Sequence, residues 1–181
     1  MNRLERLETI LLIGICVGLL PGQKVVAADH IEKAGSILQI AIPSVAYGAT
    51  FYLRDGHGRN QFYESFVANL AVTYGLKYSI HKTRPNGGAH SFPSGHTSAA
   101  FQGASFIYRR YGLKYAIPAY IGAGFVGYSR VESNNHFTED VLAGAAIGIA
   151  SSFYFTKPYH GFHVAPVTRN GTYGFTISRK W

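Results

Sequence analysis

The stretch PSGHTSAAFQGASFIY (residues 93–108) begins with proline, serine and glycine and continues without any Lys, Arg, Asp or Glu. Serine is a preferred helix N-cap, so a helix is predicted to begin just after Ser94. The free backbone N–H groups of a first helical turn bind anions, and Gly95 allows a close approach to them. His96 would lie beside such an anion, where an imidazole can donate a proton near neutral pH.

Four more stretches lack these charged residues: 34–53, 65–76, 115–129 and 141–156. Glycines and prolines separate them, as expected between helices. Only the first reaches the roughly 20 residues that cross a bilayer. The others are also consistent with buried helices of a soluble bundle. The pattern predicts an all-α bundle but does not decide between a membrane-embedded bundle and a soluble one.

The N-terminal segment, residues 1–28, has the three parts of a secretory signal. Arg3 and Arg6 precede the apolar residues 10–20, and small residues follow a Pro-Gly break at 21–22. A cleaved signal peptide and an uncleaved first transmembrane helix both fit this pattern. With the segment counted, the prediction is a six-helix bundle.

The basic residues of the predicted loops favour a membrane-embedded bundle. Of the 181 residues 14% are charged and 47% are hydrophobic, the net charge is +8, and the mean hydropathy is only +0.03. With alternating chain direction, one side of the bundle carries Arg3, Arg6, Arg54, Arg59, Arg109, Arg110 and Lys114. This is a positive-inside distribution, so the opposite side is expected to face the periplasm across a bacterial inner membrane. A soluble periplasmic protein remains the alternative.

Two further clusters fall on the side of Ser94. Lys77 and Arg84, seven residues apart, would share a helix face if the helix continued that far. Arg130, His136 and Asp140 form the other cluster, in which Asp140 could accept a hydrogen bond from one ring nitrogen of His136. Each cluster alone is also typical of ordinary helix ends. Together they supply cations, amides, two imidazoles and a carboxylate, the set that phosphoryl transfer requires.

In order, the three clusters resemble the signature of the type 2 phosphatidic acid phosphatases, which are related to bacterial class A acid phosphatases and vanadium haloperoxidases. That signature is Lys-x6-Arg-Pro, Pro-Ser-Gly-His and Ser-Arg-x5-His-x3-Asp. Its fixed positions correspond here to Lys77, Arg84, Pro85, Pro93, Ser94, Gly95, His96, Ser129, Arg130, His136 and Asp140.

The resemblance implies a role for each matched residue. His136 would be the nucleophile that forms a phosphohistidine, Asp140 would orient it, and His96 would protonate the leaving group. The phosphate-binding residues would be Lys77, Arg84, Ser94, Gly95 and Arg130. The resemblance implies no metal and no cofactor. The chemistry would fall in residues 29–158, the phosphatase domain.

Three functions stay open. The first is a membrane phosphatase acting on a phosphorylated lipid: a polyprenyl diphosphate, a phosphatidate-type lipid or lipid A. The second is a soluble periplasmic acid phosphatase, and the third is a non-catalytic membrane protein that binds phospholipid. Expected partners are the lipid substrate and membrane lipids, with no nucleic acid, and no signal indicates an oligomeric state. The tail 159–181 alternates weakly in polarity, which suggests a β-hairpin or a disordered end.

Overall fold

Five helices and a two-stranded hairpin make up the structure, a computed structural model that describes residues 27–159, 162–169 and 172–179. The helices are α2 (Ala27–Tyr52), α3 (Gly56–Ser79), α4 (Gly95–Tyr111), α5 (Leu113–Glu132) and α6 (Thr138–Phe155). Nearly all of the predicted N-terminal signal or helix, residues 1–26, lies outside the described residues. The predicted all-α bundle is confirmed, with five of its six expected helices described.

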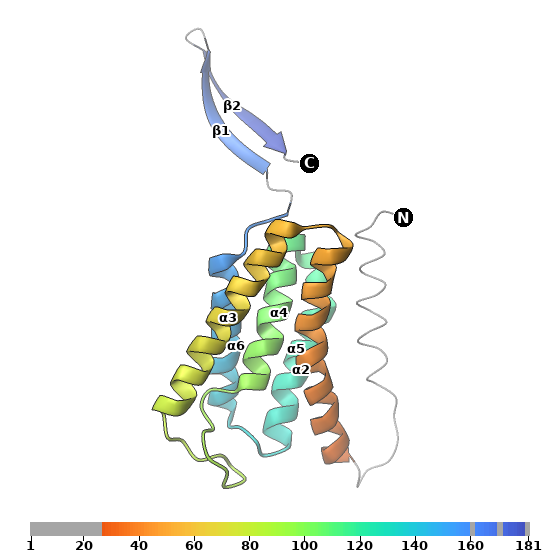
Figure 1. The fold of residues 1–181 in the computed structure, drawn as a ribbon, viewed down its shortest axis with the longest axis vertical. Helices are drawn as coiled ribbons and strands as arrows, with labels where there is room; N and C mark the ends of the chain where they lie inside the picture. Colours follow the sequence, from red (N-terminus) through yellow and green to blue (C-terminus); the bar gives the residue numbers. More distant parts are fainter. Residues whose placement is uncertain (1–26, 160–161, 170–171, 180–181) are drawn as a thin grey trace.

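Helix α4 lies in the middle of the bundle and packs against α2, α3, α5 and α6 (Figure 1). Chain direction alternates, so α3 and α5 end where α2, α4 and α6 begin, at the lower end in Figure 1. All three predicted clusters are therefore at this end of the bundle.

The local sequence explains where the helices begin. Ser94 caps α4 as predicted, since its side chain accepts a hydrogen bond from the N–H of Thr97 at 3.4 Å. Asp55 caps α3 in the same way, accepting from Gly58 at 2.8 Å. Gly112 has a φ of 104°, which favours glycine, and this residue alone separates α4 from α5.

Two glycines allow α6 to approach α4 closely. A Cβ on Gly144 would collide with the backbone carbonyl of Ser94, and one on Gly148 with that of Ser98. These glycines are one helical turn apart and face the same neighbour. The backbone of α6 therefore lies directly against the beginning of α4.

Buried polar side chains line the contact between α3 and α4, and we call them the polar seam. Gln102 donates to Ser65 at 2.9 Å, while Thr73 and Asn69 both donate to Ser98, at 3.0 and 3.4 Å. All five side chains are at most 1% exposed. Because burial makes an unpaired polar group costly, these bonds fix the rotation of α4 against α3.

A buried ion pair joins three elements at the opposite end of the bundle. Arg110 donates to both carboxylate oxygens of Asp55, and the guanidinium also donates to the carbonyl of Lys157 at 2.8 Å. Burial by itself raises the pKa of Asp55, but the hydrogen bonds from Arg110 and Gly58 outweigh it and hold that pKa below its usual value. The pair ties the start of α3 to the ends of α4 and α6.

The chain after α6 forms two antiparallel strands, β1 (Phe162–Arg169) and β2 (Thr172–Arg179), with Phe162 opposite Arg179. This hairpin extends away from the helices beyond the end of α6, opposite the predicted site (Figure 1).

Candidate active site

The loop between α3 and α4, residues 80–94, forms one wall of the candidate active site. Its two arms are held together by a bond from the N–H of Ser91 to the carbonyl of Lys82, at 2.7 Å. Its tip is tied to the α5–α6 loop by a bond from the N–H of Asn86 to the carbonyl of Asn134, at 3.1 Å. The backbone thus fixes the cluster of Lys77 and Arg84 to the cluster of Arg130, His136 and Asp140.

Lys77 lies in the last turn of α3 with its ammonium group buried beneath this loop. Nζ donates to the carbonyls of His90 and Pro93, at 2.9 and 2.8 Å. An ammonium group has three hydrogens, so one remains for an anion. Lys77 therefore both shapes the loop before Ser94 and brings a positive charge to it.

Arg84 does not share a helix face with Lys77, which corrects the sequence-based expectation. Helix α3 ends at Ser79, and Arg84 lies in the loop, where Nε donates to the carbonyl of Ala89 at 3.1 Å. The seven-residue spacing brings the two cations together through a turn of the loop. Both charges nevertheless act on the rings of His96 and His136.

Ser94, Gly95 and His96 lie at the N-terminus of α4, where the sequence places them. Ser94 is fully buried, and its N–H donates to the backbone carbonyl of Asp140 at 2.9 Å. Gly95 is the first helical residue, and His96 is half-buried in the first turn. The charges that act on the His96 ring are those of Arg130, Arg84, Glu32 and Lys77. The three predicted phosphate-binding cations thus gather around one imidazole.

Arg130, near the end of α5, is only 2% exposed. Its guanidinium donates to the backbone carbonyl of Glu32 at 2.6 Å and to the hydroxyl of Ser129 at 3.1 Å. The Glu32 carboxylate lies 3.8 Å from Nη1 and accepts a bond from Asn135 at 2.8 Å. Helix α2 therefore holds the third cation in place.

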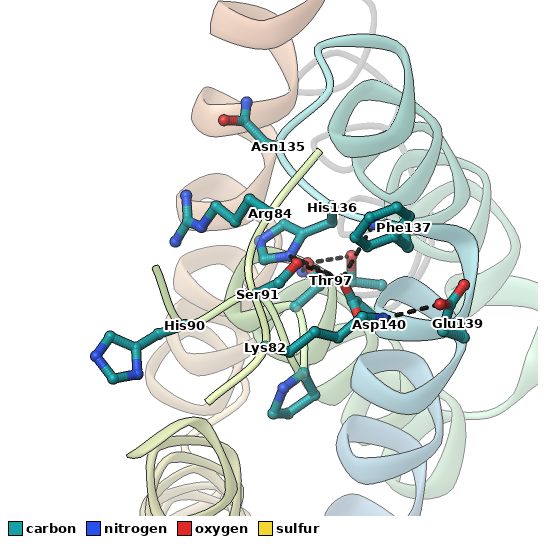
Figure 2. A network of polar contacts seen from close by, with 12 residues as sticks. Lys82, Arg84, His90, Ser91, Thr97, Asn135, His136, Phe137, Glu139 and Asp140 are labelled. Atoms are coloured by element: carbon teal, nitrogen blue, oxygen red, sulfur yellow. Dashed lines mark hydrogen bonds and ion pairs between the residues drawn. The ribbon is translucent and has the colours of Figure 1, made fainter. Parts of the chain in front are cut away.

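His136 and Asp140 lie at the start of α6, but they do not form the direct hydrogen bond expected from their spacing. His136 precedes the helix, and its Nδ1 is 3.7 Å from Oδ2 of Asp140, which is longer than a hydrogen bond. Instead Oδ2 accepts from the hydroxyl of Ser91 and from the N–H of Phe137, and Oδ1 accepts from Lys82 at 2.6 Å (Figure 2).

The environment of His136 keeps its imidazole neutral. The residue is 3% exposed, and burial, together with the positive charges of Lys77 and Arg84, lowers its pKa from 6.5 to about 4. A neutral imidazole has a free lone pair at neutral pH, which a nucleophile or a base requires.

Lys82 is the fourth cation of the site. Partial desolvation works against its charged form, but the hydrogen bonds from Lys82 to Asp140 and Glu139 outweigh this and raise the pKa of Lys82. Four residues that contact the predicted site residues were not predicted from the sequence: Lys82, Ser91, Glu32 and Asn135. Lys82 was visible as a further cation between Lys77 and Arg84, whereas Ser91, Glu32 and Asn135 fall outside any recognisable spacing.

This arrangement is suited to holding and transferring a phosphoryl group. Cations and helix N-terminal amides converge on two imidazoles, of which that of His136 is buried and that of His96 half-buried. Among the described residues there is no group of three or more His, Cys, Asp or Glu side chains that could hold a metal ion.

Comparison with known proteins gives consistent results. The model of the PAP2 superfamily matches residues 69–162, a little more than half of the chain. A lipid A 1-phosphatase of Porphyromonas gingivalis is 46% identical over 77 residues, which are 40% of this chain but only 17% of that longer protein. A lipid A 4'-phosphatase of Helicobacter pylori is 28% identical over 141 residues, 71% of each chain.

Among solved structures, LpxE of Aquifex aeolicus superposes with a TM-score of 0.55 at 20% identity, covering 82% of this chain and 84% of that one. This similarity concerns the fold. The predicted family and fold class are confirmed by these matches, and the relatives named here are phosphatases, as the predicted enzyme class requires.

Proposed function

The chain belongs to the PAP2 superfamily, and on that basis we propose that it is a metal-independent phosphatase of membrane lipids that works through a phosphohistidine on His136. The observation that carries the proposal is the neutral, buried His136, on whose ring the positive charges of Lys77 and Arg84 act. Lipid A is the proposed substrate, since the relatives in P. gingivalis and H. pylori are named for it. Polyprenyl diphosphates and phosphatidate-type lipids are the other candidates.

The proposed reaction has two steps. In the first, the Nε2 lone pair of His136 attacks phosphorus, the bond from phosphorus to the lipid oxygen breaks, and His96 gives that oxygen a proton. In the second, water attacks the phosphohistidine, its proton returns to His96, and phosphate leaves. Both steps pass through charge on the phosphoryl oxygens. The positive groups of Lys77, Arg84 and Arg130, the Ser94 hydroxyl and the Gly95 amide are proposed to stabilise that charge.

Phosphate release tests the proposal. Detergent-purified protein should release phosphate from at least one of lipid A, phosphatidate, phosphatidylglycerol phosphate and undecaprenyl diphosphate. His136→Ala should abolish release, whereas His57→Ala, an exposed histidine at the other end of the bundle, should not. Labelled phosphate should be trapped on the wild-type protein as an acid-labile adduct that the His136→Ala variant lacks. Undiminished turnover by His136→Ala would refute the mechanism, and binding without turnover would support the non-catalytic alternative.

We propose in addition that the bundle is embedded in the membrane. One helix, residues His30–Tyr52, is long and apolar enough to span a bilayer by its own composition. On α5, the exposed side chains Ile117, Ile121 and Tyr128 follow one another along the outer face. Exposed aromatic residues occur near both ends of the bundle, with Tyr74, Tyr78 and Phe137 at the site end and Phe51, Tyr52, Phe153 and Tyr154 at the other. Such rings favour the two membrane interfaces.

Carbonate extraction tests membrane embedding. The protein should stay in the membrane pellet and be released only by detergent. Release by carbonate alone would favour the soluble periplasmic acid phosphatase, for which an aryl phosphate should be the better substrate.

The periplasmic orientation of the site is tested by cysteine labelling. In a Cys16→Ser background, Thr83→Cys places a thiol on the exposed site loop and His57→Cys places one at the opposite end. A membrane-impermeant maleimide should label the first in intact cells and the second only after permeabilisation. The reverse pattern would overturn the orientation.

The division of the chain is likewise a proposal: residues 1–28 as signal or first helix, 29–158 as the phosphatase domain, and 159–181 as a separate tail. The family match over 69–162 and the helices from Ala27 to Phe155 support a phosphatase domain in the middle of the chain. Deleting residues 162–181 should therefore leave phosphate release intact.

A further inference from the structure

We propose that Ser91, which lies outside the three motifs, is a positioning residue that links Asp140 to His136 and determines which ring nitrogen attacks phosphorus. This inference rests on the proposed function, because it assigns a task within the same site. It concerns the group that lies between the nucleophile and the carboxylate expected to orient it.

The geometry places the Ser91 hydroxyl between the two side chains (Figure 2). Oγ lies 2.5 Å from Oδ2 of Asp140 and 3.5 Å from Nδ1 of His136. The direct distance between those two atoms of His136 and Asp140 is 3.7 Å. Ser91 and Asp140 are fully buried and His136 is 3% exposed, so bulk water does not compete for these positions.

The available hydrogens determine the direction of these bonds. An ionised carboxylate only accepts hydrogen bonds, so Ser91 gives its single hydroxyl hydrogen to Asp140. Only lone pairs of Oγ are then left for His136, and Nδ1 must carry the imidazole hydrogen to use them. Nε2 is therefore the nitrogen with the free lone pair. The serine thus selects the tautomer that attacks through Nε2.

The same chain of contacts stabilises the charge that forms on attack. When Nε2 bonds to phosphorus, the ring becomes cationic and Nδ1 keeps its hydrogen. The Ser91 dipole and the Asp140 carboxylate behind it then face a positive ring, which favours the phosphohistidine. No proton moves along the chain, and the leaving oxygen still takes its proton from His96.

Lys82 fixes the far side of this chain. Its ammonium binds Oδ1 of Asp140 at 2.6 Å, and its backbone carbonyl accepts the N–H of Ser91 at 2.7 Å. Lys82 therefore holds both the Asp140 carboxylate and Ser91, which donates a hydrogen bond to that carboxylate. This leaves Asp140 with a single orientation toward Ser91.

The test uses the full-length protein in detergent, with lipid A and p-nitrophenyl phosphate as probes. Ser91→Ala should lower kcat by about 10- to 100-fold with little change in KM, the loss that is typical when the hydrogen-bond partner that orients a metal-ligating histidine is removed. Ser91→Thr retains the hydroxyl and should recover most of the rate. Asp140→Asn should be at least as slow as Ser91→Ala. Ser79→Ala is the matched control, since that exposed serine only bonds its own helix at Gly75.

A second measurement separates positioning from a merely structural role. In ¹⁵N-histidine-labelled protein, with the His136 signals identified by their loss in His136→Asn, wild type should show a hydrogen on Nδ1 and a bare Nε2. Ser91→Ala should show a mixture of both tautomers. If Ser91→Ala does not fold, Ser91→Cys keeps nearly the same volume while replacing the strong donor with a weak one, and should behave in the same way.

The outcomes distinguish this inference from the proposed function. A Ser91→Ala variant within threefold of wild-type kcat and with an unchanged tautomer would overturn the inference, even if His136→Ala were inactive. A wild-type protein that releases no phosphate from any substrate would overturn the proposed function, and the tautomer spectrum would still decide the role of Ser91.

Discussion

The backbone N–H of Ser94 donates a hydrogen bond to the backbone carbonyl of Asp140 at 2.9 Å. This bond joins the helix start that is proposed to bind phosphate to the helix start beside His136, the proposed nucleophile. The two segments of the candidate site are therefore fixed by main chain as well as by side chains. The relative position of His96 and His136 thus depends on how closely α6 packs on α4.

The first prediction tests that dependence at Gly144. A methyl group there would collide with the Ser94 carbonyl, so Gly144→Ala should push the two helix starts apart. We expect kcat to fall by about 100-fold, as for a displacement of about 1 Å in a reacting pair. Gly124→Ala is the control, because a Cβ on Gly124 would meet nothing within 4 Å. Equal activity of the two variants would show that this close approach does not position the site.

The second prediction concerns pH. Because the pKa of His136 is lowered to about 4, the residue stays neutral from neutral pH down to that value. Its protonation should therefore reduce kcat/KM only near pH 4, well below the second ionisation of a phosphate monoester near 6. An ¹⁵N titration of His136 in detergent checks this directly. Titration of the ring above pH 6 would contradict the prediction.

The third prediction addresses Lys77. Lys77→Met retains the volume but removes the charge and leaves the carbonyls of His90 and Pro93 without their donor. We expect kcat/KM to fall at least about 100-fold, as when a donor to a developing oxyanion is lost. Inhibition by orthovanadate should weaken in parallel. Lys157→Met, an exposed lysine at the other end of the bundle, should match wild type in both assays.

The fourth prediction concerns the stability of the opposite end. Asp55→Asn leaves the buried Arg110 charge without its partner, which costs about 3–5 kcal/mol in similar cases. Tm in detergent should fall by about 6–20 °C, whereas Glu64→Gln, an exposed carboxylate on the same helix, should change it little. Replacing both partners by Leu and Met should recover most of the loss.

The lowered pKa of Asp55 determines how the contribution of this ion pair to stability depends on pH. The folded-state pKa of Asp55 is depressed, so the pair stabilises the fold above the unfolded value near 3.9, and the contribution is lost as pH falls through the folded value. Asp55→Asn and wild type should therefore converge in Tm at acidic pH. A constant difference between pH 7 and pH 3 would contradict this assignment.

The sequence predicts the helical bundle and the site residues that carry recognisable spacing. Charge-free stretches and the Ser94 cap depend on local chemistry, so they can be read residue by residue. The contacts of Arg84 and Asp140 could not be predicted in this way. They depend on where α3 ends and on how the loop returns across α6, which places Ser91 between two residues that a helical spacing would bring into direct contact.

Glu32 illustrates the same limit at longer range. It lies almost a hundred residues before Arg130, and only the packing of α2 on the end of α5 brings the two together. Its contact arises from tertiary structure, which no short motif encodes.

The polar seam changes how the near-zero mean hydropathy should be understood. A hydropathy average counts Ser65, Asn69, Thr73, Ser98 and Gln102 as polar, but these side chains are buried and hydrogen-bond to one another inside the bundle. The outward surface is more apolar than the mean hydropathy suggests, since large hydrophobic side chains such as Ile117 and Ile121 are exposed on it. Surveys that recognise membrane proteins by mean hydropathy will misclassify chains that keep their hydroxyls and amides on the inside.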